Sequence, residues 1–197
     1  MKTPYNEIVN IASIGSQTNP ISLNEILRKA NDEQLTPAAQ NKERVLFLGI
    51  DVQQDFMDNG ALGVPGAHGD VERMTQFIYN NMDKITNIAV SIDTHTPHQI
   101  FHPCWWIDEN GNNPAPYTPI TLADLDSGKY RAVIYPRQSR DYVEHLEKDG
   151  KKTLCVWSYH CLQGTSGAAF ENQFANMIYF HSVAKKAVTQ RLVKGQD

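Results

Sequence analysis

Five titratable residues stand at or just after the ends of the apolar runs in this sequence. Asp51 follows the first run, Asp93 and His95 follow the second, His160 comes after the third, and Lys194 follows the fourth. In an open α/β sheet, ligands bind outside the carboxyl ends of the strands, so these residues would meet at one edge. A single Asp or Lys in a loop is usually only solvated. Polar groups after all four runs favour a functional site.

A divalent metal is the first chemistry that these residues suggest. Asp93 and His95 are two residues apart, and side chains at that spacing in an extended segment point to the same side. His160 would complete a set of two imidazoles and one carboxylate, which suits Zn²⁺, with Fe²⁺ or Mn²⁺ as alternatives, and leaves positions open for water or a ligand. His98 and His102 lie nearby and could replace or assist one of the ligands.

The order of the elements predicts an α/β fold with a mostly parallel, doubly wound sheet. The first apolar run is continuous rather than alternating, which is typical of a strand buried on both faces. We expect Ser22 to cap the first helix, and Thr165 or Ser166 to cap the last. The predicted strands are 45–50, 88–92, 153–157 and 187–193, and the predicted helices are 23–30, 70–84, 139–149 and 167–184.

Two regions look like additions to this core. Residues 1–44 are rich in Asn, Gln, Ser and Pro, and we interpret them as an N-terminal arm. Residues 97–135 form a long excursion within the predicted domain 45–197, and long loops in compact domains are often functional.

Composition excludes several classes of function. The chain has 197 residues, 41% of them hydrophobic, and a formal net charge of −4, so we expect a folded protein that does not bind nucleic acid. Its apolar runs are too short to span a bilayer, which requires about 20 residues, and we expect no membrane partner. Three widely spaced cysteines do not form a disulfide framework. A cytoplasmic location fits these features.

Four segments, taken in order, resemble the signatures of the isochorismatase-like cysteine hydrolases, and specifically of nicotinamidases. The resemblance covers the chain from Val45 onward, except for the excursion. The segments are 45–56 (VLFLGIDVQQDF) with 60–67 (GALGVPGA), Asp93-Thr94-His95, 157–170 (WSYHCLQGTSGAAF), and Lys194-Gly195.

The resemblance implies a three-layer αβα sandwich and a hydrolase that cleaves a small heterocyclic amide, nicotinamide to nicotinate and ammonia, with a Cys, Asp and Lys triad. Asp51 would take the thiol proton, and Lys194 would stabilise the thiolate and the developing anion. A divalent metal, most simply zinc, would be held by Asp93, His95 and His160 and would orient the substrate through its ring nitrogen. Substrate-binding positions would be Gln53, Phe56, Leu62 and Trp157.

The chain departs from the family pattern at the nucleophile. The family's cysteine lies on a strand-to-helix turn beyond the lysine motif, and none of Cys104, Cys155 and Cys161 matches it. We therefore expect a chain that is incomplete at its C-terminus. The alternatives are a metal- or ligand-binding member without catalysis and a family hydrolase acting on another substrate. Homo-oligomers are expected from the resemblance alone.

Overall fold

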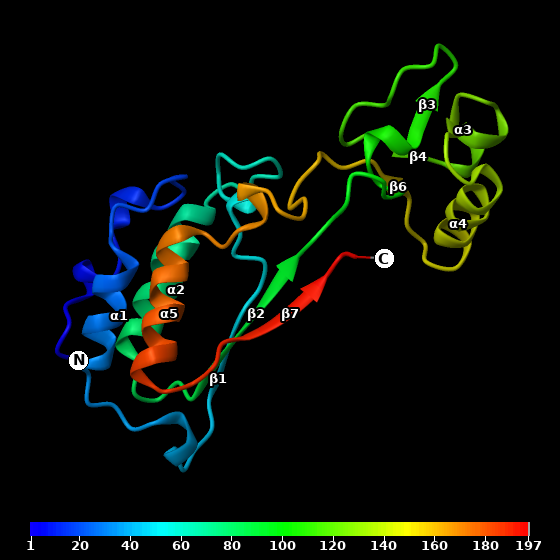
Figure 1. Cartoon of the computed structure of the whole chain (residues 1–197). Helices are drawn as coiled ribbons and strands as arrows, with labels where there is room; N and C mark the ends of the chain where they lie inside the picture. Colours follow the sequence, from blue (N-terminus) through cyan, green and yellow to red (C-terminus); the bar gives the residue numbers. More distant parts are fainter. Residues whose placement is uncertain (197) are drawn as a thin grey trace. The chain divides into compact units, whose positions relative to one another are not determined.

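The computed structural model describes residues 1–196, which form two compact units (Figure 1). The first unit comprises Met1–Thr94 and Gln163–Gln196, and the second comprises His95–Leu162. In the described part of the chain, no helix combines the length and the apolar character that crossing a membrane requires. The predicted limits at residues 44 and 45 stay a prediction, since the units divide the chain elsewhere.

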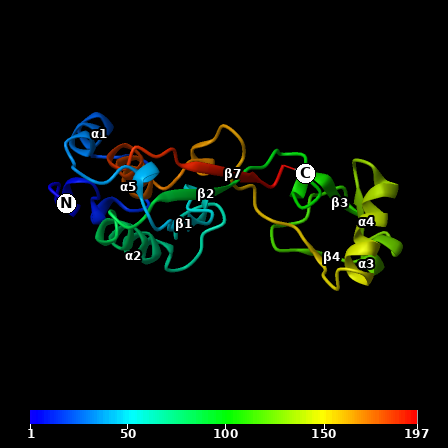
Figure 2. The ribbon, with the colours of Figure 1, turned by 90° about the horizontal axis from the view of Figure 1, so that it is seen from below.

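A three-stranded parallel sheet lies beside the helices of the first unit (Figures 1 and 2). Its strands are β1 (Leu46–Gly49), β2 (Asn87–Asp93) and β7 (Gln190–Lys194), with β2 in the middle. Leu48 lies opposite Ala89 on one side of β2, and Lys194 lies opposite Asp93 on the other. The predicted α/β class with a parallel sheet is confirmed, and the register brings the ends of β2 and β7 together.

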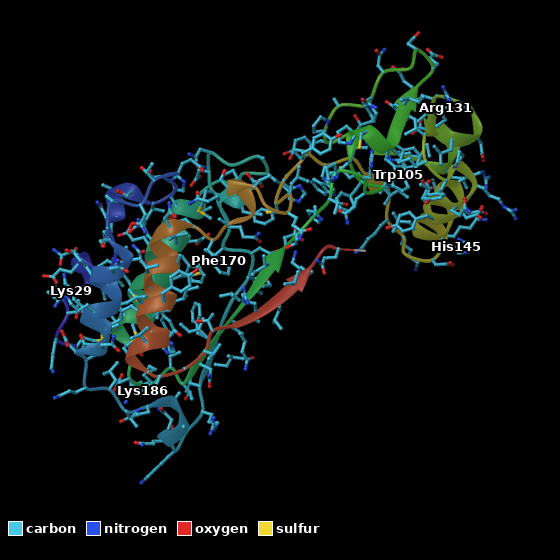
Figure 3. All side chains as sticks on the ribbon, in the orientation of Figure 1. Lys29, Trp105, Arg131, His145, Phe170 and Lys186 are labelled. Atoms are coloured by element: carbon cyan, nitrogen blue, oxygen red, sulfur yellow. The ribbon has the colours of Figure 1, made fainter. Side chains whose placement is uncertain are left out.

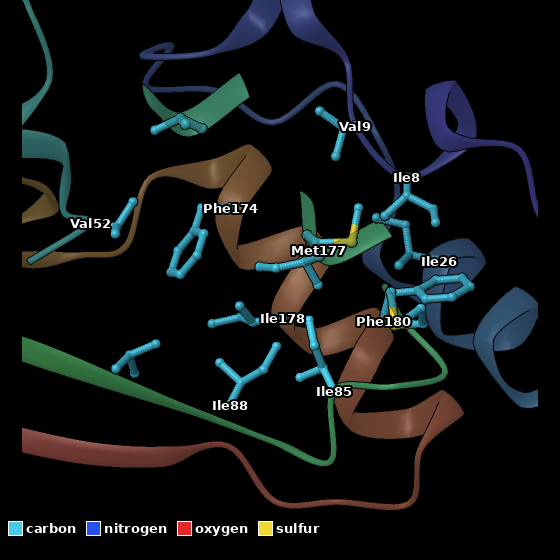
Figure 4. Packing of buried hydrophobic residues seen from close by; sticks show 14 of the residues in the cluster. Ile8, Val9, Ile26, Val52, Ile85, Ile88, Phe174, Met177, Ile178 and Phe180 are labelled. Carbon is cyan, nitrogen blue, oxygen red and sulfur yellow. The ribbon is translucent and has the colours of Figure 1, made fainter. Parts of the chain in front are cut away.

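Three helices build the core of this unit. They are α1 (Leu23–Asn31), α2 (Ala67–Asn80) and α5 (Asn172–Ala184), and α5 contacts α1, α2 and β2. Phe174, Met177 and Ile178 of α5 are fully buried in one hydrophobic cluster with Ile85 and with Ile88 of β2 (Figure 4).

Residues 1–44, which we expected to form an arm, contribute to this same core. Ile8, Val9 and Ile26 are buried in it, and α1 packs along α5. The side chain of Glu33 also accepts hydrogen bonds from the backbone N–H groups of Lys2 and Thr3, which ties the N-terminus to the end of α1.

The prediction that the first strand is buried on both faces is wrong. Phe47 and Gly49 face the helices, and a Cβ added to Gly49 would lie 2.8 Å from the ring of Phe174. Leu46 and Leu48 point to the opposite face and are 58% and 46% exposed. Within the first unit the helices cover one face of β1, so its continuous apolar run is not matched by burial on both sides.

The predicted caps are also corrected. α5 begins five to six residues later than expected for a cap at Thr165 or Ser166, because Glu171 occupies the N-cap and its carboxylate accepts from the N–H groups of Gln173 and Phe174. Residues 166–168 instead form a short 3₁₀ helix. Ser22 does stand at the N-cap of α1, but its side chain makes no capping hydrogen bond.

The second unit contains two small antiparallel pairs and two helices. β3 (Trp106–Asp108) pairs with β5 (Tyr130–Ala132), and β4 (Pro119–Ile120) pairs with β6 (Leu154–Cys155). The helices are α3 (Leu122–Asp126) and α4 (Pro136–Lys148). Trp106 is fully buried at the centre of this unit, and the indole N–H of Trp105, labelled in Figure 3, donates to Ser139 Oγ at 2.9 Å.

The run 153–157 was therefore assigned to the wrong sheet. It forms β6, which pairs with β4 rather than joining the parallel sheet. A run of a few apolar residues can serve either kind of strand, and its pairing partner lies in the excursion, where no strand was expected. The excursion and α4 together make a unit with its own core.

Candidate functional site

An ion-paired cluster lies at the carboxyl ends of all three parallel strands. Lys194 Nζ, at the end of β7, is 3.0 Å from Asp51 Oδ2 and 2.9 Å from Asp93 Oδ1. Burial lowers the pKa of Lys194, but the hydrogen bonds to Asp93 and Asp51 outweigh burial, and the pKa is raised. Lys194 is therefore a cation at neutral pH. We call Asp51, Asp93 and Lys194 the acid–lysine cluster.

Asp51 is held in place by a residue that sequence reasoning missed. Ser91 on β2 accepts the backbone N–H of Asp51 at 3.0 Å, and its hydroxyl donates to Asp51 Oδ1 at 2.6 Å. Asp51 has φ of 54°, a left-handed conformation that Asp adopts more readily than most residues. Only the register of β1 and β2 reveals Ser91, so no sequence motif could have indicated it.

Replacing Ser91 with alanine is expected to destabilise the first unit by about 1–2 kcal/mol, because Asp51 loses both hydrogen bonds to the hydroxyl. Denaturant unfolding measures this. Ser91→Thr keeps the hydroxyl and should recover most of the loss. Equal losses in the two variants would show that packing, and not the hydroxyl, explains the effect.

Gln53 also positions the end of β2. Its side-chain amide donates to Asp93 O and Ala168 O at 2.8 and 2.9 Å, and its carbonyl accepts the N–H of Asp93 at 2.8 Å. The side chain is fully buried. A direct contact of Gln53 with substrate stays a prediction, whereas its hold on the Asp93 backbone is a feature of the structure.

Phe56 and Asp51 line one cavity in the first unit. It has a volume of about 150 Å³, and its other lining residues include Val64 and Met74. Leu62 is not part of this lining, and its backbone N–H donates to Asp55 O.

Phe170, labelled in Figure 3, packs edge to face on Phe174 with ring centroids 6.3 Å apart.

Trp157, the remaining predicted substrate-binding residue, lies in the second unit. It is 38% exposed and meets Tyr117 edge to face, with ring centroids 5.9 Å apart. Its backbone N–H donates to Phe101 O at 2.7 Å. Substrate binding by Phe56, Leu62 and Trp157 stays a prediction.

Two buried imidazoles of the second unit face one another. The ring centroids of His95 and His160 are 4.7 Å apart, and the backbone N–H of His95 donates to Cys161 O at 3.0 Å. His160 Nδ1 is 2.7 Å from Ser158 O. Since a carbonyl only accepts, Nδ1 carries the proton and Nε2 carries the lone pair.

These imidazoles and Asp93 form a set whose chemistry fits a divalent metal. Asp93 is joined to His95 through Thr94 alone, and the ligand atoms of Asp93, His95 and His160 lie within 4.8 Å of one another. All three residues are buried. Two neutral imidazoles and one carboxylate suit zinc or a similar ion, and the Ser158 contact is the kind that fixes the tautomer of a ligating histidine.

The two further histidines named from the sequence differ sharply. His98 is exposed. His102 is fully buried, and its ring centroid lies 5.9 Å from that of His95 and 6.3 Å from that of His160. Burial lowers the pKa of His102, and its neighbours His95 and His160 lower it further, so the His102 ring is neutral at neutral pH.

Each cysteine has a local contact in the second unit. Cys104 Sγ donates to Pro97 O at 3.1 Å. Cys155 lies in β6, and burial raises the pKa of its thiol. Cys161 is fully buried, and its carbonyl accepts from His95. A raised pKa and a buried position both disfavour the thiolate, which is the reactive form.

Comparison with solved structures identifies the fold. The yeast nicotinamidase Pnc1p, both with the inhibitor nicotinaldehyde and without it, matches with a TM-score of 0.50 over 78% of this chain, at 19% and 20% sequence identity. A nicotinamidase and pyrazinamidase of Acinetobacter baumanii matches 80% of the chain at 19% identity, with a TM-score of 0.46. The chain therefore has a nicotinamidase-like α/β fold.

The match covers only part of the known enzyme. The chain spans 57% of the length of the yeast nicotinamidase. No family model matches the sequence, and no curated protein has a significantly similar sequence. The fold is thus established by structure, and the activity is a matter for proposal.

Proposed function

We propose that this chain is a nicotinamidase-like amidohydrolase that acts on a small heterocyclic amide beside a bound divalent metal, most simply Zn²⁺. The acid–lysine cluster supports this proposal most directly. It joins one cation to two carboxylates, at 3.0 and 2.9 Å, at the carboxyl ends of three parallel strands. That edge is where ligands bind in open α/β sheets.

Each residue of the acid–lysine cluster and its neighbours has a separate role in the proposed reaction. Asp51 would be the acid/base that accepts the proton of an attacking thiol and returns it to the leaving amine, a thiol that none of Cys104, Cys155 and Cys161 matches in the family pattern. Lys194 stabilises the thiolate and the anion that develops on the amide oxygen. Ser91 and Gln53 hold Asp51 and Asp93 in position through the hydrogen bonds described above.

Asp93, His95 and His160 would hold the metal. When bound, the ion supplies a Lewis acid and a fixed point of attachment for a ring nitrogen of the substrate. Phe56, on the cavity that it shares with Asp51, offers a flat apolar surface for the ring.

A second candidate is a binding protein of the same fold that holds the metal and the amide without turnover. The observation that favours it is the state of the thiols, since Cys155 has a raised pKa and Cys161 is fully buried. A chain without a reactive thiolate could bind the amide but could not form the covalent intermediate.

Ammonia release from nicotinamide by the zinc-loaded protein tests the proposal. We expect release that falls by at least about 100-fold in Asp51→Asn, because general acid–base catalysis contributes about that much or more. The amide substitution keeps the size of the side chain, so binding of nicotinamide should survive it. Binding without release identifies the second candidate, and absence of both contradicts the two proposals together.

A further inference from the structure

His102 is a buried polar residue that the proposed function does not use. Its side chain is fully buried in the second unit, and Nδ1 lies 3.1 Å from Pro97 O. Because the carbonyl can only accept, Nδ1 carries the proton and Nε2 presents a lone pair. Among residues 1–196, Nε2 of His102 has no hydrogen-bond partner.

An unpaired acceptor of this kind needs an explanation. Leaving a buried acceptor without a partner costs about 1–3 kcal/mol, and most buried side-chain polar atoms in proteins are satisfied by protein or by water. The imidazole could have avoided the cost by presenting Nε2 to solvent, yet the Pro97 contact fixes it in the interior. We therefore expect the lone pair of Nε2 to accept a hydrogen bond from a ligand that is not part of the chain.

The surroundings of His102 identify the kind of ligand. Its ring stands nearly perpendicular to those of His95 and His160, at interplanar angles of 88° and 89°. Phe101 and Tyr159 flank the ring, with centroids 4.7 and 4.9 Å away. A neutral imidazole beside two candidate metal ligands, in an otherwise aromatic setting, is suited to accept a hydrogen bond from a polar ligand held at those histidines.

His102 and His160 also share one pattern. In each, Nδ1 donates to a backbone carbonyl, of Pro97 and of Ser158, so that Nε2 is the accepting nitrogen. This arrangement is typical of histidines at metal centres, where the carbonyl fixes the tautomer. His102 is nevertheless not a member of the set whose ligand atoms lie within 4.8 Å of one another.

We propose that Nε2 of His102 accepts a hydrogen bond from a water molecule bound to the ion that Asp93, His95 and His160 hold. The proposal rests on the metal centre of the proposed function. His102 is thus a positioning residue, which fixes the water at an open coordination position rather than binding the ion itself.

Nuclear magnetic resonance of the full chain, with ¹⁵N-labelled histidine and ¹¹³Cd²⁺ as the probe, tests this directly. Imidazoles that bind cadmium show a one-bond ¹¹³Cd–¹⁵N coupling, which a water-bridged imidazole lacks. We expect couplings for His95 and His160, none for His102, and a shift of the His102 Nε2 resonance when cadmium binds. A coupling to His102, or an unmoved resonance, would overturn the proposal.

Variants give an independent measurement. His102→Phe keeps a ring of similar size without the acceptor, and we expect cadmium affinity to fall about 10–100-fold while one ion still binds per chain. His98→Phe, at an exposed position of the same segment, is the matched control and should bind as the wild type does. If His102→Phe does not fold, His102→Leu, which also lacks an acceptor, serves instead, and the wild-type spectra need no variant. Unchanged affinity in the folded variant contradicts the role of His102, whereas absence of cadmium binding by the wild type removes the metal centre as well.

Discussion

His95→Ala is expected to lower zinc affinity by more than about 100-fold, because it removes one of three protein ligands, whereas loss of an outer contact costs about 10–100-fold. Isothermal titration of the metal-free protein with Zn²⁺ measures it. Asp93→Asn and His160→Ala should behave in the same way, since all three residues belong to one buried set.

The chain offers a matched control for this experiment. His98 lies three residues from His95 and is exposed, so His98→Ala should bind one zinc ion with wild-type affinity. Circular dichroism of each variant separates loss of the ligand from loss of the fold. If the folded His95→Ala protein retained wild-type affinity, the ion would have to be held elsewhere.

Phe174→Ala is expected to lower the free energy of unfolding by about 3–5 kcal/mol. Phe174 is fully buried in α5 (Figure 4). A Cβ added to Gly49 would lie 2.8 Å from its ring. The close approach to Gly49 shows that the ring fills the space over β1, so its removal leaves a cavity that the sheet cannot easily close.

Chemical denaturation measures this loss, and Phe77→Ala provides the comparison. Phe77 lies on α2, is 55% exposed and has its ring 6.1 Å from that of Phe47. Removing it should cost about 1 kcal/mol or less, because surface substitutions rarely cost more. Similar losses for the two variants would mean that α5 does not anchor the core of the first unit.

Patterns within single elements predicted much of this fold. The amphipathic spacing of α2 and the apolar run of β2 depend on neighbouring residues, and the structure has both elements within a few residues of the predicted limits. β7 was predicted from weaker patterning, and its pairing with β2 confirms the parallel sheet.

Pairing between distant segments could not be predicted in the same way. β6 was placed in the parallel sheet, yet it pairs with β4, which consists of two residues, Pro119 and Ile120, that carry no strand pattern. The cap of α5 was misplaced for a related reason, since Glu171 acts through a carboxylate that reaches forward to Gln173 and Phe174.

The same distinction between local patterns and distant contacts applies to the residues of the candidate site. Asp51, Asp93 and Lys194 follow their strands in the sequence, so their meeting at one edge was predicted, and the ion pairs confirm that they meet. The role of Ser91 could not be predicted from the sequence, because its contact with Asp51 depends on the register between two strands. His102 was named only as a possible assistant, since burial and an unpaired nitrogen are properties of the folded chain.

The most direct test of the account is a titration of the zinc-loaded protein with nicotinamide and, separately, with benzamide. Benzamide has the same shape but lacks the ring nitrogen that the ion would bind. The account predicts saturable binding of nicotinamide that requires zinc, is lost in the folded His160→Ala protein, and is much weaker for benzamide. Equal binding of the two amides, or binding of nicotinamide that is unchanged when zinc is removed, would contradict it.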